Sequence, residues 1–169
     1  MRFEITGKNV FPYTLTATYR TLKPASAEQC AVKLSTHLDR PQAVEGETVH
    51  LTVTVENAED KGQGMAIAII GLPSGLTLPE DMKQLKDYAL LRNNGKEKGL
   101  IGAWEVRGRE LVLYWRDLAP KQKIEVPLDL ICQVPGEYTG PASRAYLYYN
   151  ADHKHWVDAL KVTITPKAE

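Results

Sequence analysis

The chain has 169 residues, and its 21 Lys and Arg residues balance 21 Asp and Glu residues, so the formal net charge is zero. A neutral chain lacks the general positive charge that draws proteins to nucleic acid or to an anionic membrane. With 43% hydrophobic and 25% charged residues, the composition is that of a folded globular protein and not of a disordered one. The length suits one domain, or one domain plus a fragment of another.

The N-terminal residues and the two cysteines bear on the cellular compartment of the protein. No apolar run approaches the roughly 20 residues that a transmembrane helix needs, and residues 1–24 contain no signal-peptide core. We therefore expect either a cytoplasmic protein or a piece of a longer exported one. Cys30 and Cys132 form no C-x-x-C pair, so two free thiols and a single disulfide both remain open.

The first residues follow a pattern of their own. Residues 11–20 predict one strand, and residues 22–26 resemble a linker. A single strand cannot form a domain, so this strand either ends a preceding β-domain or adds to the fold that follows. We place the boundary between residues 1–25, a terminal strand with its linker, and residues 26–169, one domain.

From there on, the dominant period is two. Residues 48–55 alternate strictly, which places Val49, Leu51, Val53 and Val55 on one face. Residues 65–70 are apolar on both faces, which favours a strand packed on both sides. Further strands are predicted over 105–115 (two strands with a turn at 107–108), 123–134, 142–149 and 156–165. Short strands at this spacing predict an all-β fold, an immunoglobulin-like antiparallel β-sandwich.

Two features qualify that pattern. Pro127 falls inside a predicted strand, which argues for an edge position or a bulge there. Residues 78–89 predict one short inserted α-helix, with Pro79 in its first turn and Met82, Leu85 and Ala89 on its buried stripe. Lys83 and Lys86 share a flank of this helix, where they could capture an acidic partner or simply remain solvated.

Complete catalytic or metal-binding sets are absent from the sequence. His153 and His155 are weak metal candidates, because alternate strand residues share a face, but a polar hairpin end explains them equally. Ser74 and Ser143 lack a G-x-S-x-G motif. We therefore expect no catalytic residue, no metal and no cofactor, and we expect that the chain is not an enzyme.

The aromatic residues offer a binding alternative. Tyr146, Tyr148 and Tyr149, with Trp115 and Trp156, could form a stacking platform for bases or sugars. Their alternation divides them between two faces, so core packing is the preferred interpretation. The alternative function is an independent immunoglobulin-like adhesion or carbohydrate-binding module.

The order of several segments resembles the C-terminal receptor-binding domain of the α2-macroglobulin family, the thioester-containing protease traps and their complement relatives. The likeness runs from about Ala31 to Ile164 in the right order. The segments that carry it are residues 65–67 leading to Ser74-Gly75, the helix around residues 82–85, the strand 111–114, the Val134-Pro135 break and residues 145–149.

The resemblance implies a module of a large exported protein, a bacterial member, with residues 12–20 similar to the end of a CUB-like domain. In vertebrate members, lysines on the helix bind an endocytic receptor; matching through Met82 and Leu85 places Lys83 at one such position and Pro79 at the other. The family's thioester motif, Gly-Cys-Gly-Glu-Gln, is absent from this chain.

Taken together, we expect a non-catalytic binding or structural module of a protein that traps or inhibits proteases. Its parent would be extracellular, periplasmic or on the cell surface. The partners would be a protein or other domains of the same parent chain, with no nucleic acid and no membrane insertion by this fragment. The fragment alone is expected to be monomeric.

Overall fold

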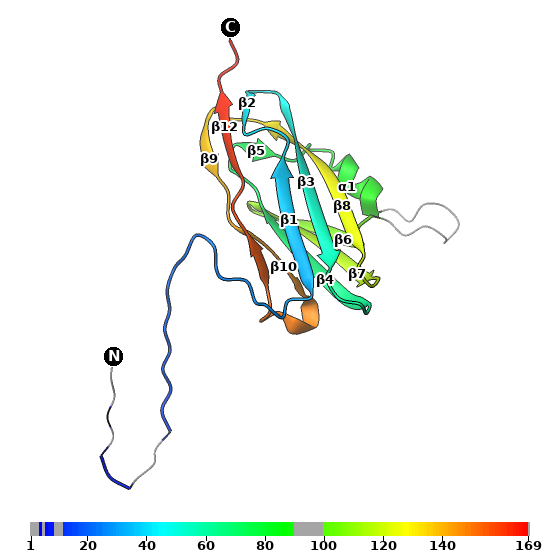
Figure 1. Ribbon diagram of the computed structural model, residues 1–169. Helices are drawn as coiled ribbons and strands as arrows, with labels where there is room; N and C mark the ends of the chain where they lie inside the picture. The colour runs from blue at the N-terminus through cyan, green and yellow to red at the C-terminus, as the bar shows by residue number, and fades with distance from the viewer. Residues whose placement is uncertain (1–3, 5, 9–11, 90–99, 169) are drawn as a thin grey trace.

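The computed structural model describes residues 4, 6–8, 12–89 and 100–168. Two sheets pack face to face, and a third, smaller sheet lies beside them at one end of the molecule (Figure 1). The first sheet runs in the order β1-β3-β8-β5 (Val32–Leu38, Thr48–Asn57, Lys123–Cys132, Leu76–Thr77). The second runs β11-β10-β4-β7-β6 (His155–Val157, Ser143–Leu147, Gln63–Gly71, Glu110–Leu118, Ala103–Arg107).

The third sheet is β2-β12-β9 (Gln42–Val44, Lys161–Thr165, Gly136–Thr139), and β2 runs parallel to β12. The helices are α1 (Lys83–Ala89) and a 3₁₀ turn, η1 (Tyr148–Asn150). The predicted all-β, immunoglobulin-like antiparallel β-sandwich with one short inserted helix is confirmed.

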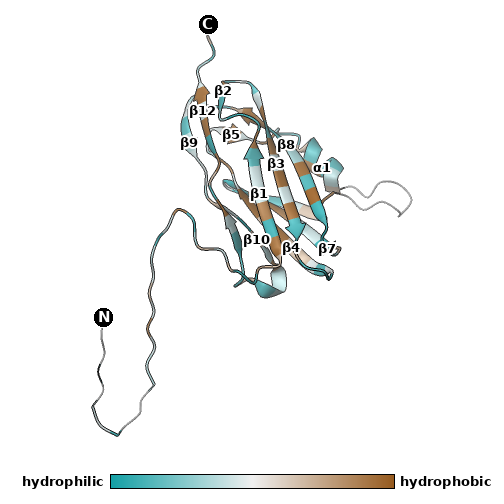
Figure 2. Ribbon diagram, in the orientation of Figure 1, coloured by the Kyte–Doolittle hydropathy of each residue, from teal (hydrophilic) through white to brown (hydrophobic). Residues whose placement is uncertain are grey.

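The core forms where the apolar faces of the two large sheets meet. Val49, Leu51, Val53 and Val55 of β3 have no exposed surface, as the strict alternation predicts. Figure 2 shows this alternation of apolar and polar residues along the strands of the sandwich.

Strand β4 is buried on both sides from Ala66 to Gly71, so the prediction for residues 65–70 holds except at Met65, which is 39% exposed. Ala66, Ala68 and Ile70 join the main core, whereas Ile67 and Ile69 lie on the outer face in a second cluster with Val112.

The helix is shorter than the sequence predicts. It begins at Lys83, and Pro79 lies in a turn before it instead of in its first turn. Met82 has a left-handed backbone with φ of 50°, which interrupts a right-handed helix. Leu85 is fully buried as expected, while Met82 and Ala89 pack against the core only partly.

Other boundaries also differ. Residues 12–20 form no strand, because nothing in the described part of the chain pairs with their backbone; in Figure 1 this segment runs away from the sandwich. The predicted strand 156–165 is divided into β11 and β12, which belong to different sheets. The hairpin turn lies at Gly108–Arg109, one residue later than predicted.

At Pro127 the structure decides between an edge and a bulge. β8 pairs with β3 along its length, but on its other side β5 reaches only Ile131 and Cys132. Pro127 therefore occupies an edge position, where its missing N–H breaks no ladder hydrogen bond.

Candidate functional site

Helix α1 carries the lysines that the sequence singled out for partner binding. Asp81 accepts a hydrogen bond from the Lys83 N–H at 3.0 Å and so begins the helix. Gln84 attaches it to β8, since its amide donates to the Asp129 carbonyl at 2.9 Å and accepts from the Asp129 N–H at 2.8 Å. Helix α1 is therefore fixed to the sandwich, and its lysines face the solvent.

Both lysines already have partners within the helix region. The Lys83 ammonium lies 2.8 Å from Asp87, and the hydrogen bond and charge of this carboxylate raise the pKa of Lys83. Lys86 donates to the Asp81 carbonyl at 2.9 Å. Exposed pairs of this kind contribute little to stability, so another acidic group could replace them at small cost. The structure brings both ammonium groups to one exposed surface of mixed charge.

The two histidines that the sequence offered as metal ligands are hydrogen-bonded to different residues. His153 Nδ1 lies 3.0 Å from the Asn150 side-chain amide, and His155 Nδ1 accepts the Leu34 N–H at 3.1 Å. Across the part of the chain that the structure describes, no three His, Cys, Asp or Glu side chains come together in a way that could hold a metal ion.

One side-chain pair was not foreseen. His50 lies 2.7 Å from Asp129, and the two residues face each other across β3 and β8. Their separation of 79 residues gives no sequence signal, because only the strand register places them together.

The serine hydroxyls have structural partners. The Ser143 side chain is buried and accepts the Gly71 N–H at 2.9 Å, while Arg109 donates to Ser74 at 2.6 Å. Among the described residues, no histidine is hydrogen-bonded to either serine.

The aromatic residues correct the prediction of core packing. Trp115 is buried, but Tyr148 and Tyr149 are 56% and 84% exposed, because β10 ends and η1 begins at Tyr148. Their rings meet edge to face, with an interplanar angle of 88°. Trp156 is half-buried beneath the Arg144 guanidinium, which lies 5.3 Å from the ring centroid.

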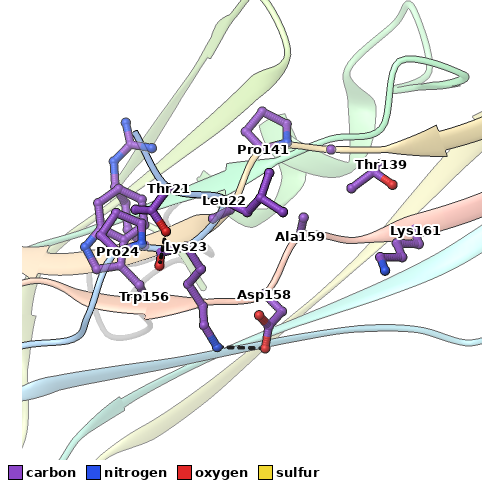
Figure 3. A pocket seen from close by; sticks show the side chains of 13 residues that line it. Thr21, Leu22, Lys23, Pro24, Thr139, Pro141, Trp156, Asp158, Ala159 and Lys161 are labelled. Carbon is purple, nitrogen blue, oxygen red and sulfur yellow. Dashed lines mark hydrogen bonds and ion pairs between the residues drawn. The ribbon is translucent and has the colours of Figure 1, made fainter. Parts of the chain in front are cut away.

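A hollow of about 520 Å³ lies between the N-terminal segment and the sandwich. Figure 3 shows its side chains: Thr21, Leu22, Lys23 and Pro24 come from the segment, and Trp156, Asp158 and Lys161 from the sandwich. Lys23 and Asp158 form an ion pair at 2.8 Å across it. The sequence predicts a linker over residues 22–26, and nothing in its composition indicates the contact of Lys23 with a residue 135 positions away.

Cys30 and Cys132 are both buried free thiols, which decides between the two alternatives. Burial raises the pKa of the Cys132 thiol. None of the helices in the described part of the chain has the length and apolar character that crossing a bilayer requires.

No protein-family model matches the chain, and no curated protein matches it. Solved structures of bacterial α2-macroglobulin do match in fold. Against trypsin-activated α2-macroglobulin from Escherichia coli, the TM-score is 0.63 at 14% identity, over 84% of this chain and 11% of that one. Against Salmonella α2-macroglobulin reacted with methylamine, it is 0.61 at 17% identity, over 85% and 10%.

A third match restricts where the similarity lies. The native E. coli structure that spans domain MG7 to the C-terminus gives a TM-score of 0.58 at 18% identity, over 85% of this chain and 25% of that one. The chain thus spans between a tenth and a quarter of these three α2-macroglobulin structures. Its sandwich shares the fold of a domain in the C-terminal region of bacterial α2-macroglobulins.

Proposed function

We propose that the chain is a non-catalytic C-terminal module of a large α2-macroglobulin-like protein that traps or inhibits proteases. The observation that supports this most is the likeness of fold to bacterial α2-macroglobulins over 84% of the chain, including one structure limited to the region from MG7 to the C-terminus. Residues 26–169 would be the receptor-binding-like domain. Residues 1–25 would supply the last strand and linker of a preceding CUB-like domain.

The pattern of apolar side chains along residues 12–20 supports this division. Tyr13, Leu15 and Tyr19 alternate along the segment and are 77%, 68% and 79% exposed. A stripe of large apolar side chains at strand spacing is typical of one face of a sheet. The rest of that sheet would belong to the preceding domain of the parent.

The proposal predicts that the native gene product is much larger than this chain of 18.9 kDa. An antibody against the sandwich should detect, in the source cells, an extracellular, periplasmic or surface-bound protein of more than roughly 100 kDa, in keeping with the tenth of each full-length chain that the match covers. After the cells are treated with trypsin, the same antibody should co-precipitate the protease. A native band near 18.9 kDa would contradict the proposal.

We also propose that Lys83 and Lys86 lie in a contact with a protein partner or with another domain of the parent. Their support is exposure on a helix that is fixed to the sandwich by Gln84. Amine acetylation followed by mass spectrometry should show slower modification of both lysines in the parent than in this chain. Equal rates at both positions, before and after protease treatment of the parent, would contradict this contact.

The carbohydrate-binding alternative has less geometric support. The edge-to-face arrangement of Tyr148 and Tyr149 presents no common flat surface for a sugar ring. Trp156 has one face covered by Arg144, which is itself paired with Glu110 at 2.8 Å.

A further inference from the structure

Strand β11 ends the five-stranded sheet, so one of its edges has no neighbouring strand. On the other edge it pairs with β10, and Arg144 lies opposite Trp156. Backbone groups of alternate residues point to the same side of a strand, so Lys154 and Trp156 present theirs to one edge. An open edge of this kind pairs readily with any extended segment that reaches it.

The N-terminal segment fills this edge. The Ala27 N–H donates to the Lys154 carbonyl at 2.9 Å. The Ser26 hydroxyl accepts the Trp156 N–H at 2.8 Å and donates to the Trp156 carbonyl at 3.2 Å. Two consecutive residues therefore satisfy three outward backbone groups, one of Lys154 just before β11 and two of Trp156 within it. We call residues 23–27 the strap.

A side-chain pair fastens the other end of the strap. The Lys23 ammonium lies 2.8 Å from Asp158, just beyond β11. The two side chains are 42% and 82% exposed, so this pair orients the strap more than it stabilises it. The fastening is thus distributed from residue 23 to residue 27.

Strand β1 also contacts β11. Its Leu34 N–H donates to the imidazole of His155, the first residue of β11. Just before β1, the buried Cys30 thiol lies 3.7 Å from the carbonyl of Ala145, the residue opposite His155 in β10. Strap, β1 and β10 therefore all hold β11 in place.

The part of the N-terminal segment that is bound to the sandwich begins at Lys23. Leu22 is 95% exposed, although it lies beside the hollow, and Tyr19 is 79% exposed. The chain therefore leaves the sandwich at residue 23, with its large apolar side chains turned to solvent.

We propose that the strap is an integral part of the sandwich that covers the β11 edge and sets the direction in which the preceding polypeptide leaves the sandwich. A module placed before residue 23 would then be held in a defined orientation and would move together with the sandwich. This inference needs only the contacts within this chain, so it holds whether or not the parent is a macroglobulin-like protein.

The test is backbone ¹⁵N relaxation on the full 169-residue chain. Lys23, Ser26 and Ala27 should have order parameters near those of rigid strands, about 0.85, while residues 12–20 should fall below about 0.6. The amides of Ala27 and Trp156 should be protected from hydrogen exchange.

The double variant Ser26→Ala/Asp158→Asn removes both side-chain attachments of the strap and leaves only the hydrogen bond of the Ala27 N–H to the Lys154 carbonyl. It should lower the strap order parameters below about 0.6 and speed exchange of the Trp156 amide at least about tenfold, since an exposed amide exchanges without prior opening. Ser35→Ala/Asp152→Asn is the matched control, because neither side chain makes a hydrogen bond or ion pair that joins the strap to β11. It should leave both readouts unchanged.

Strap order parameters below about 0.6 in the wild-type chain would overturn the proposal, whether or not the double variant folds. Unchanged Trp156 exchange in a folded double variant would overturn it too. Folding is verified by slow amide exchange at Leu51 and Val53, which lie in the fully buried part of β3.

Discussion

At the scale of single residues, Asn57 is a polar side chain whose hydrogen-bonding groups must all be satisfied inside the protein. It is fully buried at the end of β3, in phase with the core valines. Its amide nitrogen donates to the carbonyls of Lys61 and Ala119, both at 2.8 Å, and its oxygen accepts the Glu59 N–H at 3.0 Å. One side chain thus joins the loop after β3 to the loop before β8.

We predict that Asn57→Ala lowers the free energy of unfolding by about 2–3 kcal/mol, because buried carbonyls and an N–H lose their partner. Urea denaturation measures the change. Asn150→Ala, at an exposed position, is the control and should cost less than about 0.5 kcal/mol. An equally small loss of unfolding free energy in Asn57→Ala would mean that water supplies the hydrogen bonds that the Asn57 amide makes.

His155 makes stability depend on pH. Burial, and then the charges of Lys33 and Lys23, lower its pKa below 6.5, and its Nδ1 must be unprotonated to accept the Leu34 N–H. Because the folded pKa lies below the unfolded value, the contribution is complete above pH 6.5. It is lost as the pH falls through the folded pKa.

We therefore predict that the urea midpoint of the wild-type chain falls more between pH 7 and pH 5 than that of His155→Gln, in which an amide oxygen can still accept and does not titrate. His37→Gln is the control, at an exposed position on β1. Parallel pH profiles for the wild type and His155→Gln would show that His155 does not titrate in this range.

At the scale of elements, α1 acts as a cover for the open edge of β8. Gln84 occupies the outward N–H and carbonyl of Asp129, and Pro127 two residues earlier has no N–H to offer. Glu125, two residues before that, adds an exposed charge. Amide, proline and charge are three common ways of protecting an edge strand from pairing with another molecule.

We predict that Gln84→Ala lowers the free energy of unfolding by about 1 kcal/mol, the net value of such hydrogen bonds. It should also speed hydrogen exchange at Asp129. Gln133→Ala is the control, since Gln133 is exposed and its side chain makes no hydrogen bond to Asp129. Unchanged exchange at Asp129 would refute the role of Gln84.

At the scale of the whole molecule, a glycine allows the end of β4 to lie close to the connection that joins β9 of the small sheet to β10. A Cβ placed on Gly71, at the end of β4, would lie 2.1 Å from the Pro141 carbonyl oxygen between β9 and β10. A backbone atom cannot move aside as a flexible side chain would. The end of β4 and the connection between β9 and β10 can approach this closely only because residue 71 has no side chain.

Gly71→Ala is predicted to cost at least about 3 kcal/mol, at the upper end of overpacking effects. Thermal or urea unfolding would measure it. Gly62→Ala is the comparison, because its Cβ would make an ordinary contact of 3.6 Å with the Leu118 carbonyl. Similar losses for the two variants would show that the junction relaxes easily.

The sequence by itself predicted the sandwich, the face of β3 that is buried, the double burial of β4 and the presence of one helix. These follow from local periodicity, which burial on one or two faces imposes directly on the order of residues. Asn57 also carried a local signal, since it occupies a core position in the alternation, but only the structure shows which carbonyls it binds.

Only the tertiary structure decided the rest. The start of α1 depends on the left-handed backbone of Met82. The exposure of Tyr148 and Tyr149 depends on where β10 ends. The pairing of His50 with Asp129 depends on the register of β3 and β8. The strap depends on Ser26 meeting Trp156, 130 residues later. Such contacts join residues that are far apart in the sequence, and a local pattern of residues does not predict which distant residue will be the partner.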